Sequence, residues 1–196
     1  SNETFIKQSA SNTDQLIDVA NYATSVLMVD QDTLQNLRTL MDTSDTYEHY
    51  RTKVELSKSL SSLESSVLHA VNGKMALLSS SGYLLGGNGM EQAAEDYDQA
   101  DWFGRVRLAD RKTVFDPGIS AVFARLQLDT KIKPYQYLYF GRSILSYSGD
   151  YLGMVVVQIS TAKLWDRYLD RLDGTASLYL FDDSQVLHVA YCNGSD

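Results

Sequence analysis

The chain has 196 residues, of which 44% are hydrophobic and 21% are charged, the composition of a globular protein with one domain or two small ones. Its 17 basic and 25 acidic residues give a net charge of −8, and no basic run appears, which argues against a nucleic-acid partner. The single cysteine, Cys192, excludes an internal disulfide and a cysteine-cluster metal site.

Both ends of the sequence indicate a fragment of a longer protein. The longest apolar run, residues 154–157, is far shorter than the roughly 20 residues that cross a bilayer. The sequence begins with Ser1-Asn2, as after tag cleavage, and stops soon after strand-like sequence. We therefore expect any contact with a membrane to be made by flanking segments that this chain does not contain.

The first third of the sequence is predicted to be helical. A first helix is indicated by one apolar stripe, formed by Leu16, Val19, Ala20, Ala23, Val26 and Leu27. Asp32 with Gln35, and Asp45 with Glu48, resemble capping boxes that start a short helix and then a longer one. The longer helix is rich in serine, which weakens its intrinsic helicity, so packing must hold it. We interpret the region as scaffold.

The remaining sequence alternates between strand-like and helix-like patterns. Three hairpins are predicted, at residues 74–87, 137–160 and 177–191. A polar, helix-prone segment at 88–106 separates the first two hairpins, and a helix over 161–174 separates the last two. Consecutive hairpins form an antiparallel sheet with helices on its faces, so the predicted fold class is α+β.

The hairpin at 137–160 carries an unexpected arginine. If its loop is residues 148–150, Arg142 and Gln158 share one apolar face with Phe140, as diagonal neighbours across the two strands. A slip of one residue would separate them. A buried guanidinium needs a partner. That partner is either a ligand or one of three aspartates: Asp96, Asp98 and Asp101.

Other candidate sites are few. The pair Trp102-Phe103 either walls a ligand cavity or belongs to the core. The three histidines are scattered and the chain has no HExxH or G-x-S-x-G motif. The glycine-rich residues 86–89 follow a hairpin and lack the lysine of a phosphate-binding loop. We therefore expect no catalytic residues, no metal, no cofactor and no enzyme activity in this domain.

The pattern as a whole resembles a known family of sensors. Long N-terminal helices, a hairpin around "SSSGYLLGG", the aromatic pair in "DWFGRV" and the hairpin "YFGRSILSYSGDYLGMVVVQIS" resemble the Cache (PAS-like) extracytoplasmic domains of bacterial receptors. The resemblance is strongest to double-Cache domains of sensor histidine kinases, and similar domains occur on chemoreceptors and diguanylate cyclases. It implies a helical stalk at 1–70, a PAS-like ligand-sensing unit at 71–160, and a connecting helix with a partial membrane-proximal unit at 161–196.

The resemblance also implies how such a domain works. It implies a small extracellular ligand bound over the sheet, a homodimer through the N-terminal helices, and a location at the cell membrane as the extracytoplasmic portion of a receptor. Trp102 and Phe103 match the aromatic pair of the amino-acid-binding Cache motif, whereas Ala100 replaces its arginine and Gln158 its aspartate. These departures favour a sugar, a carboxylate or a peptide over a free amino acid. The alternatives are a structural or protein-interaction module without a pocket and, in third place, a small hydrolase.

Overall fold

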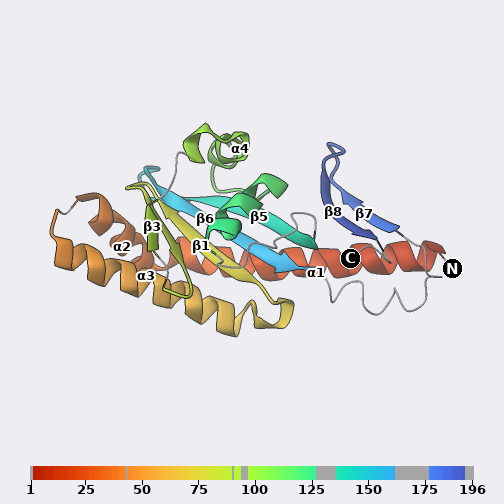
Figure 1. The fold of residues 1–196 in the computed structure, drawn as a ribbon, viewed down its shortest axis with the longest axis horizontal. Coiled ribbons are helices and arrows are strands. Elements are labelled where there is room, and N and C mark those ends of the chain that lie inside the picture. The colour runs from red at the N-terminus through yellow and green to blue at the C-terminus, as the bar shows by residue number, and fades with distance from the viewer. Residues whose placement is uncertain are drawn as a thin grey trace.

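The computed structural model describes residues 2–42, 44–89, 91–93, 97–126, 136–161 and 177–192, and these residues form an α+β fold. Three helices make up the N-terminal third: α1 (Asn2–Val29), α2 (Gln31–Asp42) and α3 (Thr46–Ser66). Figure 1 shows them on one side of the sheet, with α4 (Asp101–Leu108) on the other side. The predicted fold class, long N-terminal helices packed on an antiparallel sheet, is confirmed.

The main sheet has six strands in the order β3-β2-β1-β6-β5-β4, and every neighbouring pair is antiparallel. Its strands are β1 (Lys74–Ser79), β2 (Tyr83–Gly86), β3 (Glu91–Ala93), β4 (Val114–Phe115), β5 (Tyr137–Leu145) and β6 (Tyr151–Ser160). The short helix η1 (His69–Val71) leads from α3 into β1. Beyond the sheet lie η2 (Tyr97–Gln99), α4, η3 (Pro117–Ile119) and α5 (Ser120–Leu126).

Each face of the sheet has its own apolar core, because side chains of a strand alternate between faces. The helix-side core joins the sheet to α1–α3 and includes Leu27, Leu37, Leu60, Met75, Phe140 and Val157. The α4-side core joins the sheet to α4 and α5 and includes Trp102, Val106, Phe123, Tyr139, Met154 and Val156. Strands buried on both faces read as continuous apolar runs, which explains the unbroken Val155–Val157 stretch of β6.

Two of the predicted helix starts can be compared with the structure. Asp45 caps α3 as predicted, since its carboxylate accepts hydrogen bonds from the backbone N–H groups of Tyr47 and Glu48. The predicted cap of α2 at Asp32 is wrong. Asp30 takes this role, because its Oδ2 accepts from the N–H of Thr33 at 2.8 Å and from the Thr33 hydroxyl at 2.6 Å.

Replacing Asp30 by alanine is therefore expected to lower the free energy of unfolding by about 1 kcal/mol, the usual value of an N-cap. Asp32 lies one residue inside α2 and caps nothing, so Asp32→Ala is the matched control and should change stability by only a few tenths of a kcal/mol, roughly. Urea unfolding followed by circular dichroism measures both variants. Equal losses in the two would contradict the assignment.

The hairpin of β5 and β6 is confirmed, but its predicted register is wrong by one residue. Gln158 pairs with Tyr139 instead of Phe140, and Arg142 pairs with Val155. Paired residues lie on the same face of an antiparallel sheet and sequence neighbours alternate, so Gln158 belongs to the α4 side. Arg142 and Phe140 belong to the helix side. The predicted common face of Arg142 and Gln158 is therefore wrong.

The predicted helix-prone segment at 88–106 is only partly helical. Residues 91–93 form the edge strand β3, and the α-helix begins only at Asp101, where Trp102 and Phe103 occupy its first turn. The hairpin at 74–87 is confirmed as β1 and β2. The helix predicted over 161–174 lies almost entirely outside the described residues.

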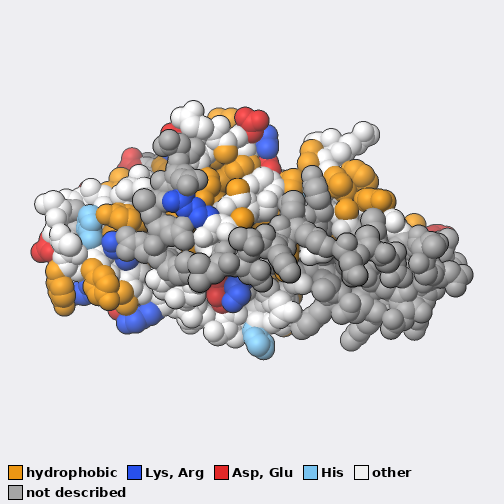
Figure 2. Space-filling model, viewed as in Figure 1, with side chains coloured by type: hydrophobic (Ala, Val, Ile, Leu, Met, Phe, Trp, Pro, Cys, Tyr) orange, Lys and Arg blue, Asp and Glu red, His pale blue; other side chains and the backbone are white. Residues whose placement is uncertain are grey.

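The last hairpin, β7 (Ser177–Phe181) with β8 (Leu187–Cys192), is confirmed and forms a separate two-stranded sheet. His188 of β8 is buried beside Phe115 of β4, with the ring centroids 6.4 Å apart. Figure 2 shows hydrophobic side chains gathered over this hairpin, where Tyr179 and Phe181 are each more than half exposed. The domain boundaries at 70 and 160 remain predictions. None of the helices in the described part of the chain combines the length and apolarity needed to span a bilayer.

Candidate ligand-binding site

A pocket of about 390 Å³ opens at the end of the sheet where β1 and β5 begin and β2 and β6 end. We call it the Gln158 pocket. It is lined by Glu64, Asn72, Lys74, Met75, Gly86, Gly87, Asn88, Phe123, Leu126, Tyr137, Gln158 and Ser160. Its volume falls in the range of small-molecule sites, about 300–1,000 Å³. The lining combines an apolar wall from α5 with polar groups from β6, α3 and the turn after β2.

Two buried polar atoms on the α4 side of the sheet make no hydrogen bond. Gln158 is 3% exposed and its Oε1 has no partner. Tyr139, which pairs with Gln158 across the strands, is 1% exposed and its hydroxyl has none. Burial raises the pKa of Tyr139, so the hydroxyl stays protonated and can donate. An unpaired buried polar atom destabilises a fold by about 1–3 kcal/mol, and such atoms in native proteins call for an explanation such as function.

A carboxylate from α3 reaches the rim of the pocket. Oε1 of Glu64 accepts a hydrogen bond from the backbone N–H of Met75 at 2.8 Å, and Oε2 lies 3.6 Å from Nζ of Lys74. A glycine at position 87 leaves room for this carboxylate, because a Cβ there would lie 2.7 Å from Oε2 of Glu64 and the end of the Glu64 side chain would have to shift. This approach of Glu64 brings the end of α3 against the pocket.

The aromatic pair predicted from the sequence lies on the same side of the sheet as Gln158. Trp102 is 5% exposed and its ring centroid is 5.8 Å from those of both Tyr97 and Phe103. A Cβ at Gly118 would lie 2.8 Å from Trp102, so the indole packs directly on the backbone of η3. Neither Trp102 nor Phe103 lines the Gln158 pocket. Their contact with a ligand remains a prediction.

The other two predicted site residues lie on the opposite side. Phe140 is fully buried in the helix-side core. Arg142 points at α1, where Nη1 donates to the hydroxyls of Thr24 at 3.1 Å and Ser25 at 2.9 Å, and Nε donates to the carbonyl of Arg111 at 2.9 Å. These acceptors are neutral, so neither Asp98 nor Asp101 is the expected carboxylate partner of Arg142; Asp96 lies outside the described residues. Burial lowers the pKa of Arg142.

Comparisons with solved structures show which known domains share this fold. The chain has 17% sequence identity to the ligand-binding domain of the Campylobacter jejuni chemoreceptor Tlp3, solved in complex with 4-methylisoleucine and with L-valine. Both superpositions have a TM-score of 0.58 and cover 95% of this chain and 67% or 68% of the Tlp3 domain. The chain therefore shares the fold of these two solved structures. No family model and no curated protein matches the sequence itself.

The α+β fold predicted from the sequence agrees with the fold of these solved structures. Within the described residues, no group of three or more His, Cys, Asp or Glu side chains is placed to hold a metal ion. Sequence reasoning found Gln158 but missed Glu64, which it left in the scaffold helix, and Phe123. The glycine run at residues 86–89 could have indicated Gly87, but it was considered only as a phosphate-binding loop and set aside because it lacks the lysine.

Proposed function

We propose that this chain is the extracytoplasmic ligand-sensing domain of a bacterial membrane receptor, and that it binds a small polar molecule in the Gln158 pocket. The buried, unpartnered Oε1 of Gln158 carries this proposal, because a ligand donor would complete its hydrogen bonding. The fold supports the receptor role. The neutral amide favours a neutral polar ligand, and Arg142, which was expected to hold an anion, is bonded to α1 instead.

The test is a thermal-shift screen of sugars, organic acids, amino acids and short peptides, followed by calorimetric titration of each compound that raises the melting temperature. A ligand that binds only the folded state raises stability in proportion to the logarithm of its concentration above Kd. A screen in which no compound from any class shifts the wild-type protein would instead favour the alternative of a structural or interaction module.

Gln158→Leu separates the ligand role of this residue from a structural one. We expect the variant to be more stable than the wild type by about 1 kcal/mol without ligand, since it removes an unpaired buried acceptor. We expect its affinity for the compound found in the screen to fall by roughly tenfold or more, the value of one lost hydrogen bond of about 1.4 kcal/mol.

The matched control is Gln35→Leu, the same chemical change at an exposed position of α2. It should change neither stability nor affinity, within about 0.5 kcal/mol. Unfolding in urea and titration calorimetry measure the two effects. A Gln158→Leu protein that loses stability and keeps its affinity would show that the amide is a structural group.

We further propose that the receptor signals through its N-terminal helices as a homodimer, and that its output module is a histidine kinase. The sequence resemblance supports the kinase, while the comparisons support a receptor domain in general. A ligand changes such an equilibrium only if it binds one state more tightly than the other. Phosphorylation of the full-length receptor, measured with and without the compound from the screen, tests the kinase. Sedimentation of this chain tests the dimer.

A further inference from the structure

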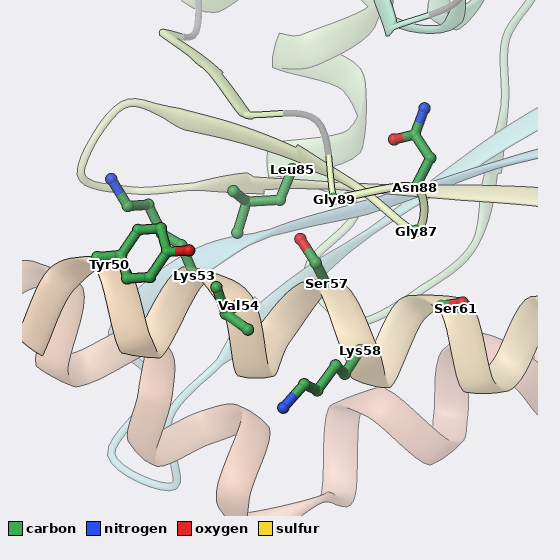
Figure 3. Close-up of a pocket in the computed structure, with 10 residues that line it drawn as sticks. All are labelled: Tyr50, Lys53, Val54, Ser57, Lys58, Ser61, Leu85, Gly87, Asn88 and Gly89. Atoms are coloured by element: carbon green, nitrogen blue, oxygen red, sulfur yellow. The ribbon is translucent and has the colours of Figure 1, made fainter.

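The Gln158 pocket continues into two further hollows around the glycine-rich turn. One hollow, of about 370 Å³, lies beside η1 and shares Glu64, Asn72 and Lys74 with the Gln158 pocket. The other, of about 330 Å³, lies between α3 and β2; we call it the α3 pocket (Figure 3). All three hollows include Gly87 and Asn88. The three hollows therefore adjoin at this turn, and we refer to them together as the groove, whose lining extends from Gln158 along α3 to Tyr50.

The polar side of this groove is made of hydroxyl and amide groups. Ser57, Ser61 and Ser65 line it from α3 at intervals of four residues, the spacing that places side chains on one helix face. In Figure 3 Ser57 points from α3 toward the turn at Gly87 and Gly89. Hydroxyls and amides both donate and accept hydrogen bonds, as sugar hydroxyls do.

Aromatic and apolar groups lie at both ends of the groove. Tyr137 and Phe123 line the Gln158 pocket, and Tyr50 lines the α3 pocket beside Leu85. Flat rings provide contact area for the C–H faces of a sugar ring while neighbouring polar groups bind its hydroxyls. A ligand that contacts the rings of both pockets must itself have more than one ring.

The lysines of the groove already have contacts of their own. Lys74 lies 3.6 Å from Glu64, and Lys58 lies 2.9 Å from Glu55 and points away from β2 in Figure 3. Nζ of Lys53 lies 4.4 Å from the centre of the Tyr83 ring. An anionic ligand would have to compete with these contacts. A neutral ligand leaves them in place.

A peptide fits the groove less well. One common way to bind an extended peptide is to add it as a strand to a free sheet edge. The strand that lines the groove, β2, is paired with β1 on one side and β3 on the other. Its backbone is therefore not available for a further strand.

We infer that the groove binds a neutral oligosaccharide of at least two rings, with one ring in the Gln158 pocket beside the unpartnered Oε1 and the next in the adjoining hollow beside η1, toward the α3 pocket. This inference rests on the proposed sensing function and specifies its ligand. Ser61 lies at the junction, since it lines both the α3 pocket and the hollow beside η1. A side chain that fills the junction should exclude a second ring and leave room for the first.

The experiment is calorimetric titration with cellobiose, maltose, xylobiose and mannobiose, and with their monosaccharides. At least one disaccharide should bind the wild type. Ser61→Leu should raise the Kd of that disaccharide by about tenfold or more and change the Kd of its monosaccharide by no more than roughly twofold. Ser62→Leu, the neighbouring exposed position outside the groove, is the matched control and should bind both like the wild type. If Ser61→Leu does not fold, Ser65→Leu blocks the groove from an exposed position.

The outcomes separate this inference from the proposed function. Binding of an amino acid, an organic acid or a peptide in the Gln158 pocket, without binding of any neutral sugar, would contradict the oligosaccharide inference. The proposed ligand-sensing function would then still hold. Equal effects of Ser61→Leu on disaccharide and monosaccharide would overturn the two-ring arrangement. Binding of nothing from any class would overturn both proposals.

Discussion

Replacing Arg142 by methionine is expected to lower the free energy of unfolding by about 3 kcal/mol, because hydrogen bonds to a charged group contribute roughly 1.5–3 kcal/mol each before relaxation. The guanidinium joins three segments: β5, the carbonyl of Arg111 after α4, and the Thr24 and Ser25 hydroxyls of α1. Methionine keeps the apolar stem of the side chain and removes its donors. The Thr24 and Ser25 hydroxyls and the Arg111 carbonyl would then lose the guanidinium as their hydrogen-bond donor.

Arg51→Met is the matched control, since Arg51 is an exposed residue of α3. It should change stability by less than about 0.5 kcal/mol. Urea unfolding measures both variants, and an Arg142→Met protein as stable as the control would show that the contacts with α1 are not formed in solution.

The same variant tests which side of the sheet binds the ligand. Arg142 lies on the helix side and is not among the residues that line the Gln158 pocket, so Arg142→Met should leave the Kd of a bound compound unchanged. In the arrangement expected from the sequence, where Arg142 and Gln158 share a face, it would abolish binding. A loss of affinity without loss of stability would show that Arg142 belongs to the ligand-binding site.

The elements of this fold were predictable because their patterns are local. The apolar stripe from Leu16 to Leu27 has the helical period, and Asp45 is followed by the backbone donors that it caps. The three hairpins follow from alternating sequence around turn residues. Gly149 shows this well, since its φ of 92° lies in the left-handed region that glycine adopts without strain.

The register was not predictable because it depends on side chains in the turn and on a bulge. The N–H of Ser146 donates to the carbonyl of Asp150, whose Oδ2 accepts from the Ser148 hydroxyl at 2.6 Å. This network makes residues 146–150 the turn and leaves Tyr147 74% exposed instead of paired. A loop at residues 148–150 would have paired Tyr147 with Tyr151, whereas Tyr151 pairs with Leu145.

The bulge adds a second shift. Leu145 pairs with Tyr151, but Ile144 pairs with Gly153, so Leu152 has no partner on β5. Side chains of a strand alternate between the two faces of the sheet, so this shift of one residue places Arg142 and Gln158 on opposite faces. A sequence with clear alternation fixes register better than β6, which is apolar at nearly every position.

The composition of the pocket was beyond sequence reasoning for a different reason. Glu64, Gly87 and Gln158 come from three distant segments, and their meeting depends on how α3 packs across the end of the sheet. Gln158 was found because an amide in an apolar strand is unusual in its own local context. Glu64 lies in a helix with many other polar residues, so nothing local distinguishes it.

Gly153→Ala is expected to destabilise the domain by about 3 kcal/mol or more, at the upper end of the effect of overpacking a core. A Cβ at Gly153 would lie 2.5 Å from the carbonyl oxygen of Leu78 and 3.3 Å from Cα of Ser79. Both atoms belong to the backbone of β1, so no side-chain rotation relieves the contact. The two central strands would have to move apart at the point where the bulge begins.

Gly104→Ala is its control, because a Cβ there meets no atom within 4 Å. Gly104 lies inside α4, where alanine is favoured over glycine by about 1 kcal/mol, so this variant should be slightly more stable than the wild type. Thermal and urea unfolding give the opposite signs expected for the two variants. If Gly153→Ala matched the wild type, β1 would not lie against β6 in this register, and the pocket at the end of these strands would have to be placed anew. The stability of Gly153→Ala, which adds a single methyl group, thus tests the pairing of β1 with β6, on which the position of Gln158 depends.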